Sequence, residues 1–234
     1  MSLVKVSLKR TFQVMFGGKG DDYMKITNYD YDMIVFLTRL VYYDLEYPQP
    51  YRCLEQIDLL SGLRLNMFDM GEYDLYVICG TNGLNDWIAN FKVALHITPR
   101  QYKRAFNEVF RLSEPRNKPI VIAGHSLGGG IAEYVASEIK KDVTCITFNG
   151  CGCLHLIKTP IQEVYNIITT RDILNGITEK IPFVKKYMKH SGIKIFIEDK
   201  GFLPLSVKSH CNFSIFDDVD IEEIINKNNT GEDK

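Results

Sequence analysis

Several features that define common protein classes are missing from this chain. No run of about 18 or more apolar residues occurs among its 234 residues, so we expect no transmembrane helix. The formal net charge is −1, which lacks the basic excess of nucleic-acid-binding proteins. The opening segment, Met1–Arg10, alternates between apolar and polar residues and carries charge. It lacks the apolar stretch and the cleavage site of a secretory signal. We therefore expect no nucleic-acid partner and a cytoplasmic location.

Cysteine is present, but not in a pattern that builds a metal site. Six cysteines occur, and Cys151-Gly152-Cys153 has no second pair at zinc-like spacing. Cys79 and Cys145 lie in apolar runs, where cysteine commonly acts as a small buried hydrophobe. A chain of this length also needs no disulfide framework. We expect no bound metal, no cofactor and reduced cysteines.

Short runs rich in Val and Ile alternate with segments of helical periodicity. Consecutive apolar positions are typical of strands covered on both faces, as in a parallel sheet between helices. No repeat or linker interrupts the pattern, so we expect one α/β domain over residues 1–227 and a disordered polar tail over 228–234. The expected strands are 63–69, 73–79, 119–123, 143–149, 163–169 and 193–198, and the expected helices are 30–46, 51–60, 99–112, 127–140 and 219–226.

The motif Gly124-His125-Ser126-Leu127-Gly128 lies between the expected strand 119–123 and the expected helix 127–140. A Gly-x-Ser-x-Gly motif in that context predicts a nucleophile elbow, the sharp strand-to-helix turn of α/β hydrolases. The turn brings its flanks so close that the positions two before and two after the serine must lack side chains. It also directs the unpaired N–H groups of the helix toward the serine hydroxyl. The alternative is a glycine-rich turn without chemistry.

A serine nucleophile needs a base and a residue that orients the base. In α/β hydrolases the chain order is Ser, then Asp or Glu, then His. Asp172 follows the expected strand 163–169, where the carboxyl end of a parallel strand carries functional loops. After Ser126, His155 precedes Asp172, and His190 lies in a lysine-rich segment that we expect to be solvated, so His210 is the candidate base. The alternative for Asp172 is a surface acid paired with a neighbouring arginine.

An oxyanion hole needs two N–H donors close to the nucleophile. Leu127, directly after Ser126, is the first candidate. The second donor usually comes from the loop after an earlier strand, and Thr81 follows the expected strand 73–79. The alternative for Thr81 is an ordinary turn. His125 lies inside the elbow, where we expect packing or support.

With these residues the chain resembles the class 3 lipases, the fungal-lipase-like α/β hydrolases. The resemblance covers residues 73–213 and rests on four blocks: Ile78-Cys79-Gly80-Thr81 with Asp86-Trp87-Ile88, Val121–Ile131, Asn166–Leu174, and Ser206–Phe213. It implies an α/β-hydrolase fold, a catalytic triad of Ser126, Asp172 and His210, and an oxyanion hole at Thr81 and Leu127. The family's His-x-Gly-Phe and Gly-x-Pro segments are absent, which leaves the substrate open.

Two segments are candidates for contact with lipid. Residues 82–98 place Trp87, Ile88, Phe91 and Leu95 at helical spacing, which is typical either of a mobile amphipathic lid or of a core helix. Residues 181–197 mix apolar side chains with lysines that would attract anionic lipid headgroups. The alternative for this segment is a solvated surface. We expect weak peripheral contact with a membrane.

Together these patterns predict a serine ester hydrolase that cleaves acyl esters of lipids through an acyl-enzyme. A phospholipase A1, a lysophospholipase, a thioesterase and an acyltransferase remain alternatives, because substrate choice depends on the pocket. A hydrolase-like binding protein without turnover is a further alternative. The expected partner is a lipid or other acyl-ester substrate, and the oligomeric state is open.

Overall fold

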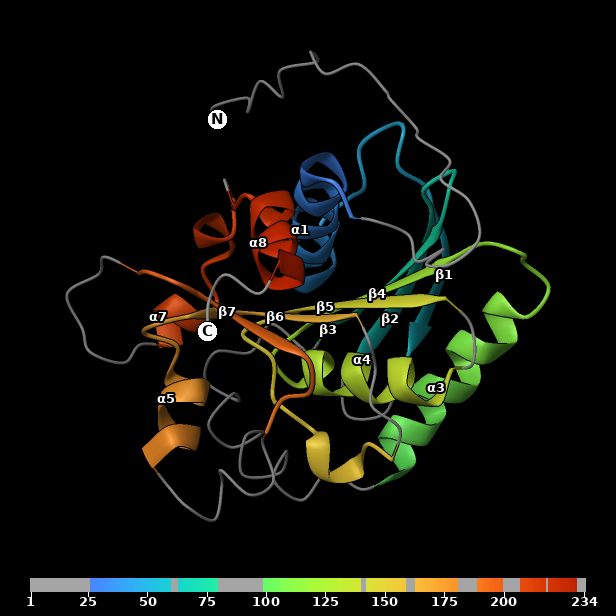
Figure 1. The fold of residues 1–234 in the computed structure, drawn as a ribbon. Coiled ribbons are helices and arrows are strands. Elements are labelled where there is room, and N and C mark those ends of the chain that lie inside the picture. The colour runs from blue at the N-terminus through green and yellow to red at the C-terminus, as the bar shows by residue number, and fades with distance from the viewer. Residues whose placement is uncertain are drawn as a thin grey trace.

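The computed structural model of the chain describes residues 26–59, 63–79, 99–139, 142–158, 163–180, 189–199, 207–217 and 219–230. Along these residues three consecutive strands follow the first helix, and helices and strands then alternate as far as the last strand (Figure 1). The strands are β1 (Cys53–Asp58), β2 (Arg64–Asp69), β3 (Asp74–Cys79), β4 (Ile120–His125), β5 (Val143–Phe148), β6 (Val164–Thr169) and β7 (Ile193–Ile197). The helices are α1 (Asn28–Tyr43), α3 (Pro99–Ser113), α4 (Leu127–Glu138), α5 (Ile173–Lys180), α7 (Val207–His210) and α8 (Ile221–Thr230), with 3-10 turns η2 (Leu154–Leu156) and η3 (Phe213–Ile215).

The seven strands form one sheet in the order of the sequence, from β1 to β7. β1, β2 and β3 pair antiparallel, whereas β3 to β7 are all parallel. The central strand β4 is buried along its whole length between β3 and β5. Because neighbouring parallel strands end at the same edge, the carboxyl ends of β4, β5 and β6 lie together, which is where open α/β sheets place their sites.

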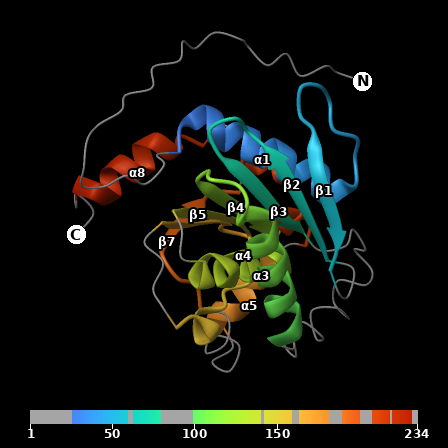
Figure 2. The same cartoon turned by 90° about the vertical axis from the view of Figure 1, so that its right-hand side faces the viewer.

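Helices cover both faces of the sheet. Figure 1 shows α1 and α8 above the sheet and α3, α4 and α5 below it, and Figure 2 shows the same two layers after a quarter turn. Side chains alternate between the faces: Val121 and Ala123 of β4 join the core beneath α1 and α8, while Ile120 and Ile122 join the core of α3 and α4. This is the α/β-hydrolase type of architecture that the sequence predicts, a mostly parallel sheet between two helical layers.

The helix boundaries follow from local chemistry. Thr27 caps α1 through a capping box, since its side chain accepts from the backbone N–H of Asp30 and the Asp30 carboxylate accepts from the backbone N–H of Thr27. Asp44 ends α1 in the left-handed conformation, with φ 55°. Pro99 begins α3, where its missing N–H costs no helical hydrogen bond.

The prediction of a helix over 51–60 is wrong, because β1 occupies Cys53–Asp58 and pairs antiparallel with β2. This strand lies at the sheet edge and is mostly exposed, so its few apolar positions show no alternation that would reveal a strand. The polar segment 228–234, expected to be disordered, begins inside α8, which ends at Thr230.

None of the helices in the described residues has the length and apolarity needed to cross a membrane. Residues 82–98, the lid candidate, lie outside the described residues, as does the first part of the lysine-rich segment 181–197. Of that segment, the structure describes the edge strand β7 and the residues just before it.

Candidate active site

Ser126 stands at a sharp turn between β4 and α4. Its backbone adopts φ 58° and ψ −126°, a conformation that non-glycine residues rarely take. The glycines explain how the turn closes. A Cβ on Gly124 would lie 2.4 Å from the Gly128 carbonyl oxygen, and one on Gly128 would lie 2.0 Å from the Ile78 carbonyl oxygen. The local geometry is therefore that of the predicted elbow, and only glycine permits it.

Asp172 and His210 form a buried pair. The Nδ1 atom of His210 hydrogen-bonds the Oδ2 atom of Asp172, and both side chains are 0% exposed. Asp172 lies between β6 and α5, and His210 is the last residue of α7, so tertiary folding brings them together. Since an ionised carboxylate only accepts hydrogen bonds, Nδ1 carries a proton, and Nε2 is the ring nitrogen that can hold the lone pair of a base.

Asn175, in the first turn of α5, holds the second oxygen of Asp172. Its backbone N–H and its side-chain amide donate to Asp172 Oδ1 at 2.7 and 2.8 Å. Burial acts to raise the pKa of Asp172, but the nearby His210 and the donors from His210 and Asn175 outweigh burial and lower it. Asp172 is thus an ionised carboxylate fixed on both oxygens.

The backbone carbonyl of His210 is held by two side chains. His125 Nε2 lies 2.8 Å from it and donates, and Asn149 Nδ2 donates to it at 3.2 Å. Burial, followed by the proximity of His210, lowers the pKa of His125 to about 3, so this ring is neutral. The hydroxyl of Tyr43 on α1 also donates to the next carbonyl, that of Cys211, at 2.8 Å. Side chains at the ends of β4 and β5 and on α1 therefore fix the segment that carries His210.

Ser126 is joined to the same cluster through its own backbone. Its N–H donates to the Phe148 carbonyl at 3.2 Å, and Phe148 directly precedes Asn149. The ring of His125, the residue before Ser126, lies 4.8 Å from the ring of His210 between centroids. The structure thus gathers Ser126, Asp172 and His210 at one edge of the sheet.

Of the two expected oxyanion donors, only Leu127 is among the described residues. It is the first residue of α4, so its N–H has no acceptor within the helix. Thr81 lies outside the described residues.

Comparison with known proteins gives the family. The Tle-like phospholipase domain, a phospholipase-like family, matches residues 38–202, which span β1 to β7 and include Ser126 and Asp172. The chain belongs to this family. An extracellular phospholipase A1 from Serratia liquefaciens is 30% identical over 95 residues, which are 41% of this chain and 29% of that protein. The chain thus matches well under two thirds of that relative's length.

Two solved structures are similar in fold at low identity. The Francisella virulence factor BioJ aligns with a TM-score of 0.41 and 12% identity, over 74% of this chain and 82% of that one. An esterase/lipase from an uncultured bacterium aligns with a TM-score of 0.42 and 11% identity, over 89% and 93% of the two chains.

The structure changes the prediction for His190 and adds detail to the prediction for His125. His190, expected in a solvated segment, is 8% exposed and pairs with the buried Glu133 of α4. The many lysines around it suggested solvent, but its partner comes from another element that no local pattern reveals. His155, in η2, is exposed. His125 supports the site, as expected, and the acceptor of its hydrogen bond is the carbonyl of His210.

Sequence reasoning missed Asn149 and Asn175 in this Tle-like phospholipase domain. Asn149 has a positive φ of 45° and follows β5 directly, which is a position where an amide at a strand end reaches neighbouring loops. Its Oδ1 atom accepts from the backbone N–H of Thr169 at 2.8 Å. The only available signal was its place at the carboxyl end of a parallel strand, next to the elbow strand.

The cysteines are free thiols, and the described residues hold no cluster of His, Cys, Asp and Glu that could bind a metal ion. Five of the six are buried. Burial raises the pKa of Cys79, Cys145, Cys151 and Cys153, which keeps these thiols protonated and unreactive.

Proposed function

We propose that this chain is a serine ester hydrolase that cleaves acyl esters of lipids, with phospholipids as the substrate class. The buried Asp172–His210 pair beside the strained Ser126 turn is the observation that carries the proposal. Membership of a phospholipase-like family and the partial match to a phospholipase A1 support the phospholipid substrate. The class 3 lipase pattern around Ser126, Asp172 and His210 supports a serine mechanism.

In this mechanism His210 Nε2 takes the proton of Ser126 Oγ while Oγ bonds to the ester carbonyl carbon. The carbonyl oxygen becomes an oxyanion, which the N–H of Leu127 stabilises together with Thr81. When the intermediate collapses, the bond to the leaving alcohol breaks and His210 returns the proton to that oxygen. Water, deprotonated by His210, then attacks the acyl carbon, the bond from that carbon to Ser126 Oγ breaks, His210 returns the proton to Oγ, and the fatty acid leaves. Asp172 fixes the tautomer of His210 and stabilises its cation.

The first test replaces the nucleophile. We expect Ser126→Ala to fold normally and to lose about three or more orders of magnitude in kcat/KM on short acyl esters. The variant can still bind the ester, but it has no nucleophile to form the acyl-enzyme. A fluorophosphonate probe should label the wild-type protein and leave Ser126→Ala unlabelled. Ser137→Ala, a change on the same helix α4, is the control and should be labelled as the wild type is.

A second set of assays separates substrate classes. Phospholipids with a labelled chain at either glycerol position, triglycerides, lysophospholipids and thioesters would be compared with the same protein. We expect phospholipids to give the highest kcat/KM. A wild-type protein that neither turns over any ester nor reacts with the fluorophosphonate would contradict the proposal and favour a binding protein without turnover.

A further inference from the structure

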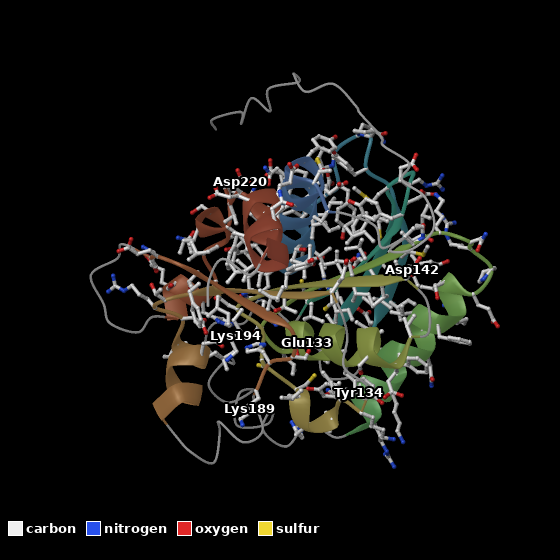
Figure 3. The ribbon with its side chains drawn as sticks, viewed as in Figure 1. Glu133, Tyr134, Asp142, Lys189, Lys194 and Asp220 are labelled. Atoms are coloured by element: carbon white, nitrogen blue, oxygen red, sulfur yellow. The ribbon has the colours of Figure 1, made fainter. Side chains whose placement is uncertain are left out.

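A second buried acid–histidine pair lies next to the candidate active site. Glu133 on α4 and His190, just before β7, have side chains that are 0% and 3% exposed. His190 Nδ1 lies 2.7 Å from Glu133 Oε1, and the other oxygen of Glu133 accepts from the backbone N–H and the hydroxyl of Ser191, each at 3.1 Å. Figure 3 shows Glu133 in the interior on α4, below the sheet, and Lys189, the neighbour of His190, farther down.

Hydrogen bonds connect this pair to Asp172. His190 Nε2 lies 3.1 Å from Asn175 Oδ1, and the amide nitrogen of Asn175 donates to Asp172 Oδ1 at 2.8 Å. Asp172 in turn binds His210. An unbroken path of side chains therefore runs from the middle of α4, through the segment before β7 and the first turn of α5, to the candidate base.

The chemistry of each group fixes the direction of the bonds from Asp172 to His190. Because the pKa of Asp172 is lowered, its carboxylate accepts, so the Asn175 amide must turn its nitrogen toward Asp172 and its oxygen toward His190. An amide oxygen only accepts, so His190 Nε2 carries a proton. Glu133 Oε2 accepts from Ser191, and Glu133 Oε1 lies opposite His190 Nδ1, so a hydrogen bond on that side holds the ring in place.

The other titratable groups around Glu133 add no charge to this pair. Burial raises the pKa of Tyr102 on α3 and of Cys151 and Cys153 after β5, so all three are neutral. The ring of His190 therefore faces the Glu133 carboxyl group and one amide oxygen, and Asn175 separates it from Asp172.

We propose that His190, held by Glu133, is a positioning residue for the reaction. Its Nε2–H fixes the orientation of the Asn175 amide, which presents its nitrogen to Asp172 and aims the other carboxylate oxygen at His210. Without that donor, the amide can turn its oxygen toward Asp172, and two acceptors then repel each other. This inference rests on the proposed serine hydrolase function, because it assigns these residues to aligning its acid.

The first test removes the amide. Asn175→Leu keeps the branching of the side chain and removes its hydrogen bonds. We expect kcat to fall by about tenfold or more, as is usual when a residue that orients an active-site group is lost. KM should stay within about twofold, since substrate contacts are unchanged. The control is Asn212→Ala, which removes the two hydrogen bonds that Ser214 donates to Asn212 just beyond His210 and should leave kcat unchanged. Unchanged kcat in Asn175→Leu would overturn the proposal.

A second pair of variants separates the hydrogen bond from the charge. In Glu133→Gln the glutamine amide can donate to Nδ1 of a neutral His190, whose Nε2–H still reaches Asn175, so we expect kcat within about threefold of wild type. Glu133→Gln/His190→Phe removes the donor without leaving a buried charge, and its kcat should fall as in Asn175→Leu. Wild-type kcat in this double variant would show that the pair only stabilises the fold.

A third measurement does not depend on turnover. In ¹⁵N-histidine-labelled protein near neutral pH, with His190→Gln used for assignment, we expect Nε2 of His190 to carry a proton. An Nε2 atom without a proton would overturn the proposal even if the enzyme is active. A wild-type protein that the fluorophosphonate does not label would reject the serine hydrolase function. A labelled wild-type protein together with an unchanged kcat in Asn175→Leu would reject only the positioning role.

Discussion

At the scale of the residue, three buried histidines differ because of what surrounds them. His125 is buried beside rings of Tyr42 and Phe213 and is neutral, with a pKa of about 3. His190 meets a carboxylate and an amide oxygen, and His210 meets the carboxylate of Asp172. Each partner comes from a distant element, so the sequence around a histidine does not specify its protonation.

The neutrality of His125 makes stability depend on pH. Its pKa falls from about 6.5 in the unfolded chain to about 3 in the folded protein, so the unfolded state takes up the proton first as the pH falls. The stability that neutral His125 contributes is therefore fully present above about pH 6.5. Between about pH 6.5 and 3 the free energy of unfolding falls by about 1.4 kcal/mol per pH unit. Urea unfolding at several pH values in this window measures it.

His125→Gln is the matched variant, because the glutamine amide can donate to the same His210 carbonyl but does not titrate. We expect the free energy of unfolding of the wild type to fall more steeply between about pH 6.5 and 4.5 than that of His125→Gln, by about 1.4 kcal/mol per pH unit. Parallel curves for the two proteins would show that His125 is not buried in its neutral form.

At the scale of the element, an ion pair fixes the start of β3 to the turn before β4. Arg116 binds both oxygens of Asp74, at 2.6 and 2.9 Å, and the Asp74 side chain is 1% exposed. We expect Arg116→Met to lower the free energy of unfolding by about 3 kcal/mol, because it leaves a buried carboxylate without its partner. Urea denaturation at neutral pH measures the loss.

The control is Arg39→Met, which breaks the pair between Arg39 of α1 and Asp217 at 3.4 Å, where both side chains are partly exposed, at 28% and 44%. A pair in that setting contributes about 1 kcal/mol or less. Equal losses in the two variants would mean that water screens Asp74 as well as it screens Asp217.

Most elements could be predicted because their burial is uniform. The runs over 119–123, 143–149 and 163–169 are apolar on consecutive positions, and they correspond to β4, β5 and β6, which the structure buries on both faces. The prediction for the edge strand β1 was wrong because one of its edges and most of its side chains face water. Where no packing acts on a segment, the apolar pattern carries little information on whether it is a helix or a strand.

At the scale of the whole molecule, Asn149 joins the ends of three separate parts of the chain. It follows β5, accepts from Thr169 at the end of β6, and donates to the carbonyl of His210. We expect Asn149→Gly, which tolerates the positive φ, to lower kcat by about tenfold and stability by about 1–3 kcal/mol, because a buried N–H and a buried carbonyl each lose a partner. Kinetics and thermal unfolding measure both effects.

Asn28→Gly is the comparison for this variant. Asn28 also joins distant segments, since its amide donates to Asp220 at 3.0 Å, but it lies at the exposed contact between α1 and α8. That change should lower stability and leave kcat unaltered. An Asn149→Gly protein with full kcat would show that the His125 donor alone suffices to hold the His210 carbonyl.

The sequence by itself determined the elbow, the central strands and the order of the candidate nucleophile, acid and base. These depend on short-range rules: glycines where the chain passes within van der Waals contact of itself, and apolar runs where both sheet faces are covered. Only the tertiary structure decided that Asn149 and Asn175 bind the Asp172–His210 pair, and that Glu133 and His190 reach it through Asn175. A buried polar side chain is satisfied by whichever element folds against it, and that pairing is set by the packing of the whole chain.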